Sequence, residues 1–188
     1  MSLVLLTGPV RSGKSAAAET LAAQRGKPVV VVAAGWDGDG EMARRIAAHR
    51  TRRPEGWTTL DVAADSGWLA SVPPDAVLLL DCFGTLVANI CHEVVGEAET
   101  ATAQDEDAVT TRVDALVAGL LSREGDSVIV SNEAGWGIVP AWPGSRLFRD
   151  ELGRANRRLA DAADAAFLVI DGRFLDLRAL PAHMTWPQ

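Results

Sequence analysis

A glycine-rich segment close to the start of the chain has the residue types and spacing that bind phosphate. Residues 8–15 match the phosphate-loop (P-loop) pattern G-x-x-x-x-G-K-[ST]. The two glycines allow the backbone to curl so that its N–H groups converge on phosphate oxygens. Lys14 would bring a positive charge to the β- and γ-phosphates of a nucleotide, and the Ser15 hydroxyl could ligate Mg²⁺. The predicted nucleotide-binding residues of this loop are Gly8, Pro9, Val10, Arg11, Ser12, Gly13, Lys14 and Ser15.

A carboxylate that could complete a metal site follows later in the chain. Asp81 ends the apolar run 76–81. An apolar strand that ends in aspartate is the Walker-B pattern, in which the carboxylate reaches Mg²⁺ directly or through a water molecule. Aspartate is also a common turn residue at strand ends, so Asp81 alone is a weak indication. Together with the P-loop it predicts a metal site formed by Ser15 and Asp81.

A histidine followed by arginines forms the third group of candidate residues. Met42, Ile46 and His49 have the spacing of one helix face, so His49 is expected among apolar residues near a helix end. One interpretation is a half-buried histidine favoured by the helix dipole. The residues that follow directly are Arg50, Thr51, Arg52 and Arg53. They form either a solvated basic turn or a clamp for a triphosphate, because guanidinium groups bind phosphate oxygens in bidentate pairs.

Apolar runs that alternate with helix-forming segments predict the fold that positions these residues. The P-loop lies between an apolar run and a helix expected to begin at about Lys14. Continuous β-branched and apolar runs are typical of parallel strands covered on both faces. Strands are expected over residues 3–6, 29–34, 76–81, 127–132 and 166–170, with an edge strand over 57–61. The pattern predicts a three-layer α/β fold, with a mostly parallel central sheet flanked by helices.

Shorter segments complete the expected fold. Residues 63–71 are expected to form a short helix, and the acidic segment 96–107 a solvated connection. Asp171-Gly172 predicts a C-terminal hairpin. The loop 133–144 is rich in tryptophan, glycine and proline, and it follows a strand. It is therefore expected to face the ligand crevice at the carboxyl edge of the sheet.

Composition limits the classes of protein to consider. The chain has 188 residues, which suits one domain over residues 1–180 with a tail over 181–188. Its net charge of −7 makes it a poor general binder of nucleic acid. Its two cysteines lack metal-site spacing and indicate neither a disulfide framework nor a zinc site. No apolar run is long enough to span a membrane and no basic region precedes the first one, so the cytoplasm is the expected location.

Several further segments combine with the P-loop into a specific pattern. They are Glu41-Met42-Ala43…Arg45-Ile46…His49, Arg53-Pro54…Trp57-Thr58, Leu79-Leu80-Asp81-Cys82, Asn132-Glu133…Gly135…Gly137-Ile138-Val139-Pro140 and Phe148-Arg149-Asp150…Gly153-Arg154…Asn156…Leu159-Ala160. Together they resemble the bifunctional adenosylcobinamide kinase / adenosylcobinamide-phosphate guanylyltransferase family of cobalamin biosynthesis. The resemblance covers about residues 3–178. The P-loop is generic to many nucleotide-binding proteins, whereas the histidine segment and the segment 132–140 are far more specific.

The resemblance implies a RecA-like P-loop fold, a homotrimer and two reactions. Family members phosphorylate the aminopropanol hydroxyl of adenosylcobinamide with ATP or GTP. They then transfer GMP from GTP to that phosphate, which gives adenosyl-GDP-cobinamide and pyrophosphate. The second reaction passes through a covalent guanylyl-histidine, and His49 stands at the matching position. Besides the P-loop, the family's GTP contacts fall here on Ala33, Ala34, Gly35, Arg50, Thr51, Arg52, Arg53, Asp61 and Asp81.

Two other functions remain open from the sequence. One is a small-metabolite P-loop kinase in which His49 is structural, which would transfer phosphate without forming a nucleotidylated protein. The other is a nucleotide-binding protein without catalytic activity. The sequence favours the bifunctional enzyme, because neither alternative explains both the histidine–arginine cluster and the apolar crevice loop.

Overall fold

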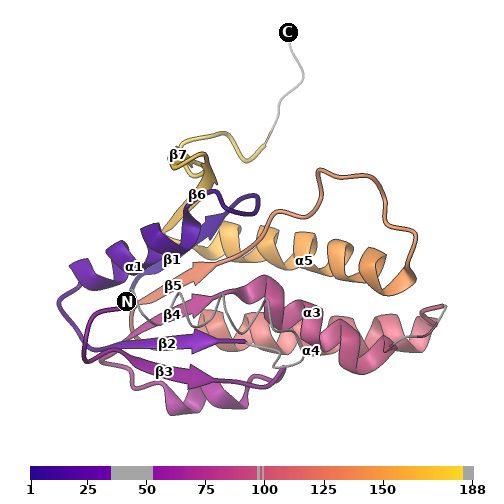
Figure 1. Ribbon diagram of the computed structural model, residues 1–188, viewed down its shortest axis with the longest axis horizontal. Helices are drawn as coiled ribbons and strands as arrows, with labels where there is room; N and C mark the ends of the chain where they lie inside the picture. The colour runs from indigo at the N-terminus through magenta and orange to yellow at the C-terminus, as the bar shows by residue number, and fades with distance from the viewer. Residues whose placement is uncertain (35–52, 97, 99, 184–188) are drawn as a thin grey trace, which may run out of the picture.

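The computed structural model describes residues 1–34, 53–96, 98 and 100–183, and its described strands form one seven-stranded sheet (Figure 1). The sheet order is β3-β2-β4-β5-β1-β6-β7, and only the β6–β7 pair is antiparallel. The strands are β1 (Leu3–Thr7), β2 (Val29–Ala33), β3 (Thr58–Asp61), β4 (Val77–Asp81), β5 (Ser127–Val130), β6 (Ala165–Ile170) and β7 (Arg173–Asp176). The helices are α1 (Lys14–Gln24), α3 (Phe83–Val95), α4 (Ala103–Ser122) and α5 (Pro143–Ala162), with a 3₁₀ helix at Gly67–Ser71. The predicted α/β fold is confirmed.

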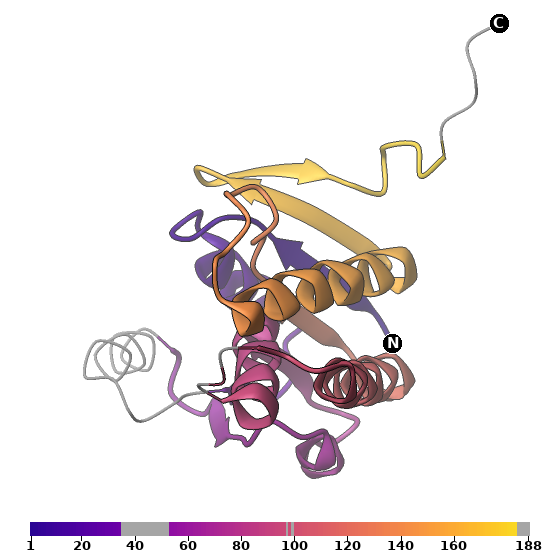
Figure 2. The ribbon, with the colours of Figure 1, turned by 90° about the vertical axis from the view of Figure 1, so that its right-hand side faces the viewer.

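Helices cover both faces of the sheet and give the three predicted layers (Figures 1 and 2). Side chains alternate between the faces of a strand, so Leu5 and Leu6 of β1 enter different hydrophobic clusters. Ala18 and Ala22 of α1 pack in the cluster that contains Leu6. Helices α3, α4 and α5 pack over the opposite face in the larger cluster that contains Leu5. None of the described helices is long and apolar enough to cross a membrane.

The strand order decides which residues meet at the carboxyl edge of the sheet. β5 lies between β1, which leads into the P-loop, and β4, which ends in Asp81. Val130 of β5 pairs in register with Leu6 on one side and with Asp81 on the other. The residues that follow β5 therefore lie between the P-loop and Asp81.

Two connecting segments differ from the sequence-based expectation. Within 63–71, only Gly67–Ser71 is helical, and it forms a 3₁₀ turn rather than an α-helix. In the segment 96–107, α4 begins at Ala103, so its last part is helical rather than a solvated connection. A capping box explains this early start: the Thr102 side chain accepts from the Asp105 N–H, while the Asp105 carboxylate accepts from the Thr102 N–H. The hydrogen bonds that the Thr102 N–H and hydroxyl donate to the Asp105 carboxylate lower the pKa of Asp105 from its usual value.

The predicted C-terminal hairpin is present and lies beside the P-loop. Asp171 and Gly172 both have positive φ angles, 47° and 72°, as a two-residue type I′ turn requires. The turn joins β6 to β7 and reverses the chain at the end of the sheet. The tail expected over 181–188 is described only as far as residue 183, where it is exposed.

Candidate active site

The P-loop forms a tight turn between β1 and α1 that requires glycine. Gly8 and Gly13 have φ angles of 144° and 100°, which residues with a side chain rarely adopt. A Cβ atom at position 8 would lie only 2.3 Å from the carbonyl oxygen of Val169, so this site also lacks room for a side chain. Helix α1 begins at Lys14, as predicted. Its first backbone N–H groups have no partner within the helix and can therefore bind phosphate.

Neighbouring backbone fixes the P-loop on two sides. The N–H of Glu133, just after β5, donates to the carbonyl of Gly8 over 3.0 Å. The N–H of Gly172, in the β6–β7 turn, donates to the carbonyl of Ser12 over 2.9 Å. These two hydrogen bonds constrain the shape of the loop, which lowers the entropic cost of binding a ligand there.

The Lys14 side chain lies against the loop that precedes it. Its Nζ donates to the carbonyls of Gly8 at 2.9 Å and Pro9 at 2.6 Å, and to Ser12 Oγ at 3.3 Å. Only 6% of Lys14 is exposed, and this burial lowers its pKa, partly opposed by the nearby charge of Asp81. The ammonium group is thus held by weak, neutral acceptors at the position where the P-loop pattern expects phosphate oxygens.

The two predicted metal ligands are brought together. Ser15 Oγ donates to Asp81 Oδ1 over 3.2 Å, although 66 residues separate them in sequence. A hydroxyl and a carboxylate oxygen are the donor types that Mg²⁺ prefers, and Mg²⁺ commonly binds one or two protein ligands together with substrate phosphates. The pair therefore fits a Mg²⁺ ion bound with a nucleotide.

Other predicted site residues lie at the carboxyl edge of the sheet too, but several strands away from the P-loop. Ala33 pairs in register with Asp61 at the ends of β2 and β3, and Ala34 follows directly. Arg53 Nη1 donates to Thr59 Oγ1 over 3.1 Å, which places Arg53 beside β3. Strands β2, β4 and β5 separate β3 from β1. At about 4.8 Å per strand, Asp61 lies roughly 19 Å from the strand of the P-loop.

The remaining predicted residues lie outside the described part of the chain. These residues are Gly35, His49, Arg50, Thr51 and Arg52. The predictions for the guanylylated histidine and for most of the arginine clamp therefore stay predictions.

A polar network at the end of β5 was not predicted as part of the site. The buried Ser131 donates from its Oγ to Asn156 Oδ1 at 2.6 Å, and Asn156 Nδ2 donates to the carbonyl of Asn132 at 2.9 Å. This network ties α5 to the turn that anchors Gly8. The sequence did contain a signal for this network. The polar pair Asn132-Glu133 directly follows an apolar strand, much as the predicted metal ligand Asp81 stands at the end of β4.

The loop from β5 to α5, predicted to face the ligand crevice, exposes apolar side chains to solvent. Trp136 is 68% exposed, Ile138 is 96% exposed, and Val139 and Trp142 are also mostly exposed. The loop runs from the carboxyl edge of the sheet to the start of α5 (Figure 1). Arginines of α5 bind its carbonyls: Arg146 donates to Pro140 and Ala141, and Arg149 donates to Gly137.

Comparisons with known proteins indicate the same family as the sequence pattern. A family model described as cobinamide kinase / cobinamide phosphate guanyltransferase matches residues 4–177. The bifunctional adenosylcobalamin biosynthesis protein CobU is 38% identical in Salmonella typhimurium and 37% identical in Escherichia coli, in each case over 90% of this chain and 96% of the relative. The bifunctional adenosylcobalamin biosynthesis protein CobP of Pseudomonas aeruginosa is 34% identical over 94% of this chain and 98% of its own.

Among solved structures, the flagellar accessory protein FlaH from Methanocaldococcus jannaschii matches 92% of this chain and 74% of its own, with 14% identity and a TM-score of 0.41. The assignment rests on the family model and on the curated relatives, which match nearly the whole chain. The chain is therefore an enzyme that belongs to the cobinamide kinase / cobinamide phosphate guanyltransferase family.

Proposed function

We propose that this enzyme first phosphorylates the aminopropanol hydroxyl of adenosylcobinamide with ATP or GTP, and then transfers GMP from GTP to the new phosphate. The products of the second reaction are adenosyl-GDP-cobinamide and pyrophosphate. The observation that carries the proposal is the anchored P-loop with Lys14 at its centre and the Ser15–Asp81 pair beside it. Family membership supports cobinamide as the phosphate acceptor.

In the first reaction the protein acts through position and charge. Backbone N–H groups of the P-loop and of the first turn of α1 bind the donor phosphates. Lys14 exchanges its carbonyl partners for phosphate oxygens and stabilises the charge that develops during transfer. No covalent intermediate on the protein is required for this step.

Ser15 and Asp81 would hold a Mg²⁺ ion at the same site. When bound, the ion neutralises phosphate charge and keeps the nucleotide oriented. The Ser15 hydroxyl donates to Asp81, so the two oxygens are close enough to serve as ligands of one ion. The pairing also keeps the carboxylate of Asp81 directed at the start of α1.

In the second reaction His49 acts as the nucleophile. Its neutral imidazole nitrogen attacks the α-phosphorus of GTP, the bond to pyrophosphate breaks, and a phosphoramidate to GMP forms. The phosphate of the corrinoid then attacks the same phosphorus and releases the histidine. Lys14 stabilises the charge of the departing pyrophosphate, and the predicted clamp arginines Arg50 and Arg52 add positive charge.

Incubation with GTP labelled on the α-phosphate, followed by intact-mass measurement, tests this function. We expect a mass increase of one GMP, which adenosylcobinamide phosphate discharges. GTP labelled on the γ-phosphate is the control and should leave no label on the protein. Corrinoid phosphorylation without a protein adduct would identify a monofunctional kinase, and nucleotide binding without either reaction would identify a non-catalytic protein.

We further propose a homotrimer, as the family resemblance implies. Exposed apolar side chains along the edge strand β7 and after it, Phe174, Leu175 and Leu180, support an association of this kind. Sedimentation equilibrium of the purified protein measures the oligomeric state directly, and a monomer at micromolar concentration would exclude the trimer.

A further inference from the structure

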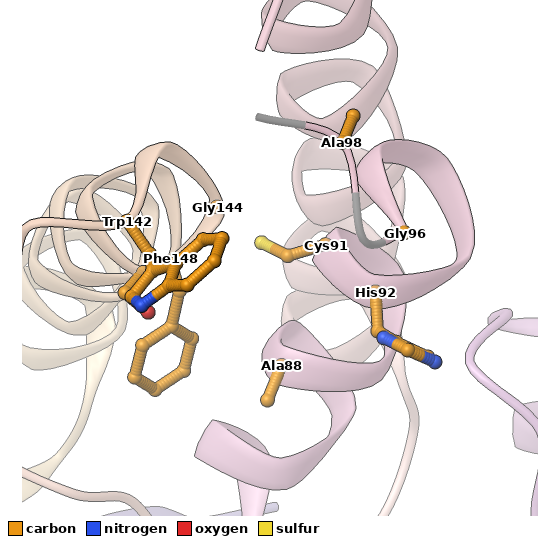
Figure 3. A pocket seen from close by; sticks show the side chains of 9 residues that line it. Ala88, Cys91, His92, Gly96, Ala98, Trp142, Gly144 and Phe148 are labelled. Atoms are coloured by element: carbon orange, nitrogen blue, oxygen red, sulfur yellow. The ribbon is translucent and has the colours of Figure 1, made fainter. Parts of the chain in front are cut away.

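A cavity of about 590 Å³ opens between the second half of α3 and the start of α5 (Figure 3). Ala88 and Cys91 of α3 face Trp142 and Phe148 across it, whereas the His92 side chain points away. Burial raises the pKa of the Cys91 thiol to about 12, so the thiol stays neutral and lines the cavity as a small apolar group. An apolar, aromatic-lined cavity of this size is typical of a site for a small organic molecule.

The apolar surface continues from the cavity toward the P-loop. The loop that ends at Trp142 in the cavity wall begins at Glu133, whose N–H is bound to Gly8. Between these ends it exposes Trp136, Ile138 and Val139 to solvent. Exposed apolar side chains clustered in this way mark a binding surface. Since Arg146 and Arg149 hold the carbonyls of the loop, the surface is shaped before a ligand arrives.

Helix α3 leads from the neighbourhood of the phosphate site to the cavity. This helix begins at Phe83, two residues after the Asp81 that accepts from Ser15. Ala88, the first cavity residue on the helix, is five residues further along, which corresponds to about 8 Å at 1.5 Å per residue. The arm of cobinamide from ring carbon to hydroxyl oxygen is an extended chain of seven bonds, which spans roughly 8 Å at ordinary bond lengths. The arm is thus long enough to follow α3 from its first residue, Phe83, to the cavity wall at Ala88.

We propose that this cavity and the adjoining apolar loop bind the corrin ring of the substrate, while the aminopropanol arm runs along the start of α3 to the phosphate site. The corrin macrocycle is broad, flat and largely apolar, with amides at its rim. Its shape and its apolar surface suit an aromatic cavity with an apolar rim better than they suit the narrow, polar P-loop. The inference rests on the proposed function, because it uses the corrinoid as the phosphate acceptor.

Two substitutions test the cavity without touching the phosphate site. Ala88→Phe fills it from α3, and Trp142→Ala removes one wall; Trp142 is exposed, so the fold does not depend on it. Both variants should raise the Kd and the KM for adenosylcobinamide at least tenfold while the Kd for GTP stays within twofold. Trp142→Phe keeps an aromatic wall and should recover most of the affinity. Ala118→Phe, which adds the same ring at an exposed position of α4, is the matched control and should change nothing.

The outcomes separate this inference from the proposed function. If the parent enzyme neither binds nor phosphorylates adenosylcobinamide, the proposed function fails. If the parent does both, and Ala88→Phe and Trp142→Ala bind the corrinoid like the parent, only the ring site is overturned. If Trp142→Ala changes the sedimentation behaviour but not the corrinoid affinity, the loop is a contact between copies of the chain and the ring site is likewise overturned.

Discussion

Replacement of Gly8 by alanine tests whether the shape of the P-loop, rather than its charge alone, carries nucleotide binding. The new methyl carbon would lie 2.3 Å from the carbonyl oxygen of Val169, a backbone atom of β6 that cannot rotate away. Ordinary contact requires about 3.4 Å, so the loop must move by about 1 Å. The φ angle of 144° adds strain of about 1–3 kcal/mol for a residue with a side chain.

These two effects give separate measurable quantities. A misplacement of about 1 Å in a positioning element costs on the order of a hundredfold in rate, so Gly8→Ala should lower kcat/KM for corrinoid phosphorylation by about that factor. The strain should lower the free energy of unfolding by about 1–3 kcal/mol, measured by urea unfolding.

Gly153→Ala is the matched control, because its Cβ atom would meet nothing within 4 Å and it lies inside α5. The same substitution there should raise the free energy of unfolding by about 1 kcal/mol and leave catalysis unchanged. If Gly8→Ala phosphorylated the corrinoid at the parental rate, the P-loop would not be positioning the phosphates and the site assignment would be refuted.

Three other substitutions, one of them with a histidine control, have distinct expected outcomes. Lys14→Ala should lower both activities on the order of a thousandfold, measured as kcat/KM, with the thermal midpoint little changed. His49→Ala should abolish the GMP adduct and the transferase but retain kinase activity, whereas His92→Ala should retain all three; an adduct still formed by His49→Ala would reject the nucleophile. The pKa of Asp126 is lowered from 3.8 to about 2, because basic side chains donate hydrogen bonds to its carboxylate. Its contribution to stability is therefore present above pH 4 and lost as the pH falls toward 2. Asp126→Asn should lower the free energy of unfolding at pH 7 by about 1–2 kcal/mol and flatten its dependence on pH in that range.

Local patterns predicted most of the fold because each pattern had a direct physical cause. β2 reads as a buried parallel strand, and all five of its residues are buried. The start of α1 at Lys14 and the turn at Asp171-Gly172 follow from glycine positions, and both are confirmed. The prediction for the start of α4 was wrong, because the acidic composition of the segment 96–107 suggested a solvated connection. Thr102 and Asp105, spaced as a capping box, were the stronger signal.

The site was predictable where a motif joins residue type to spacing. The Ser15–Asp81 contact followed from two motifs, and the structure brings these side chains together. Asn132 had a signal of this kind in its position directly after an apolar strand, whereas the role of Asn156 had none, since no pairing of distant segments can be read from one sequence. Ser131 and Asn156 are 25 residues apart, on different elements, and only the packing of α5 on the sheet joins them.

Strand order explains where such hidden site residues must lie. A P-loop strand and a strand that ends in Asp81 could be neighbours, or a third strand could lie between them, and the sequence does not distinguish these cases. Here β5 lies between them, so its carboxyl end is closer to the P-loop than the carboxyl ends of β4, β2 and β3 are. The polar pair Asn132-Glu133 therefore adjoins both the P-loop, through the bond to Gly8, and the start of α3, where the amide of Asn132 lies against Gly84. Once the order of the strands is known, polar residues at the end of the intervening strand become the first candidates for further contacts with the transferred phosphate.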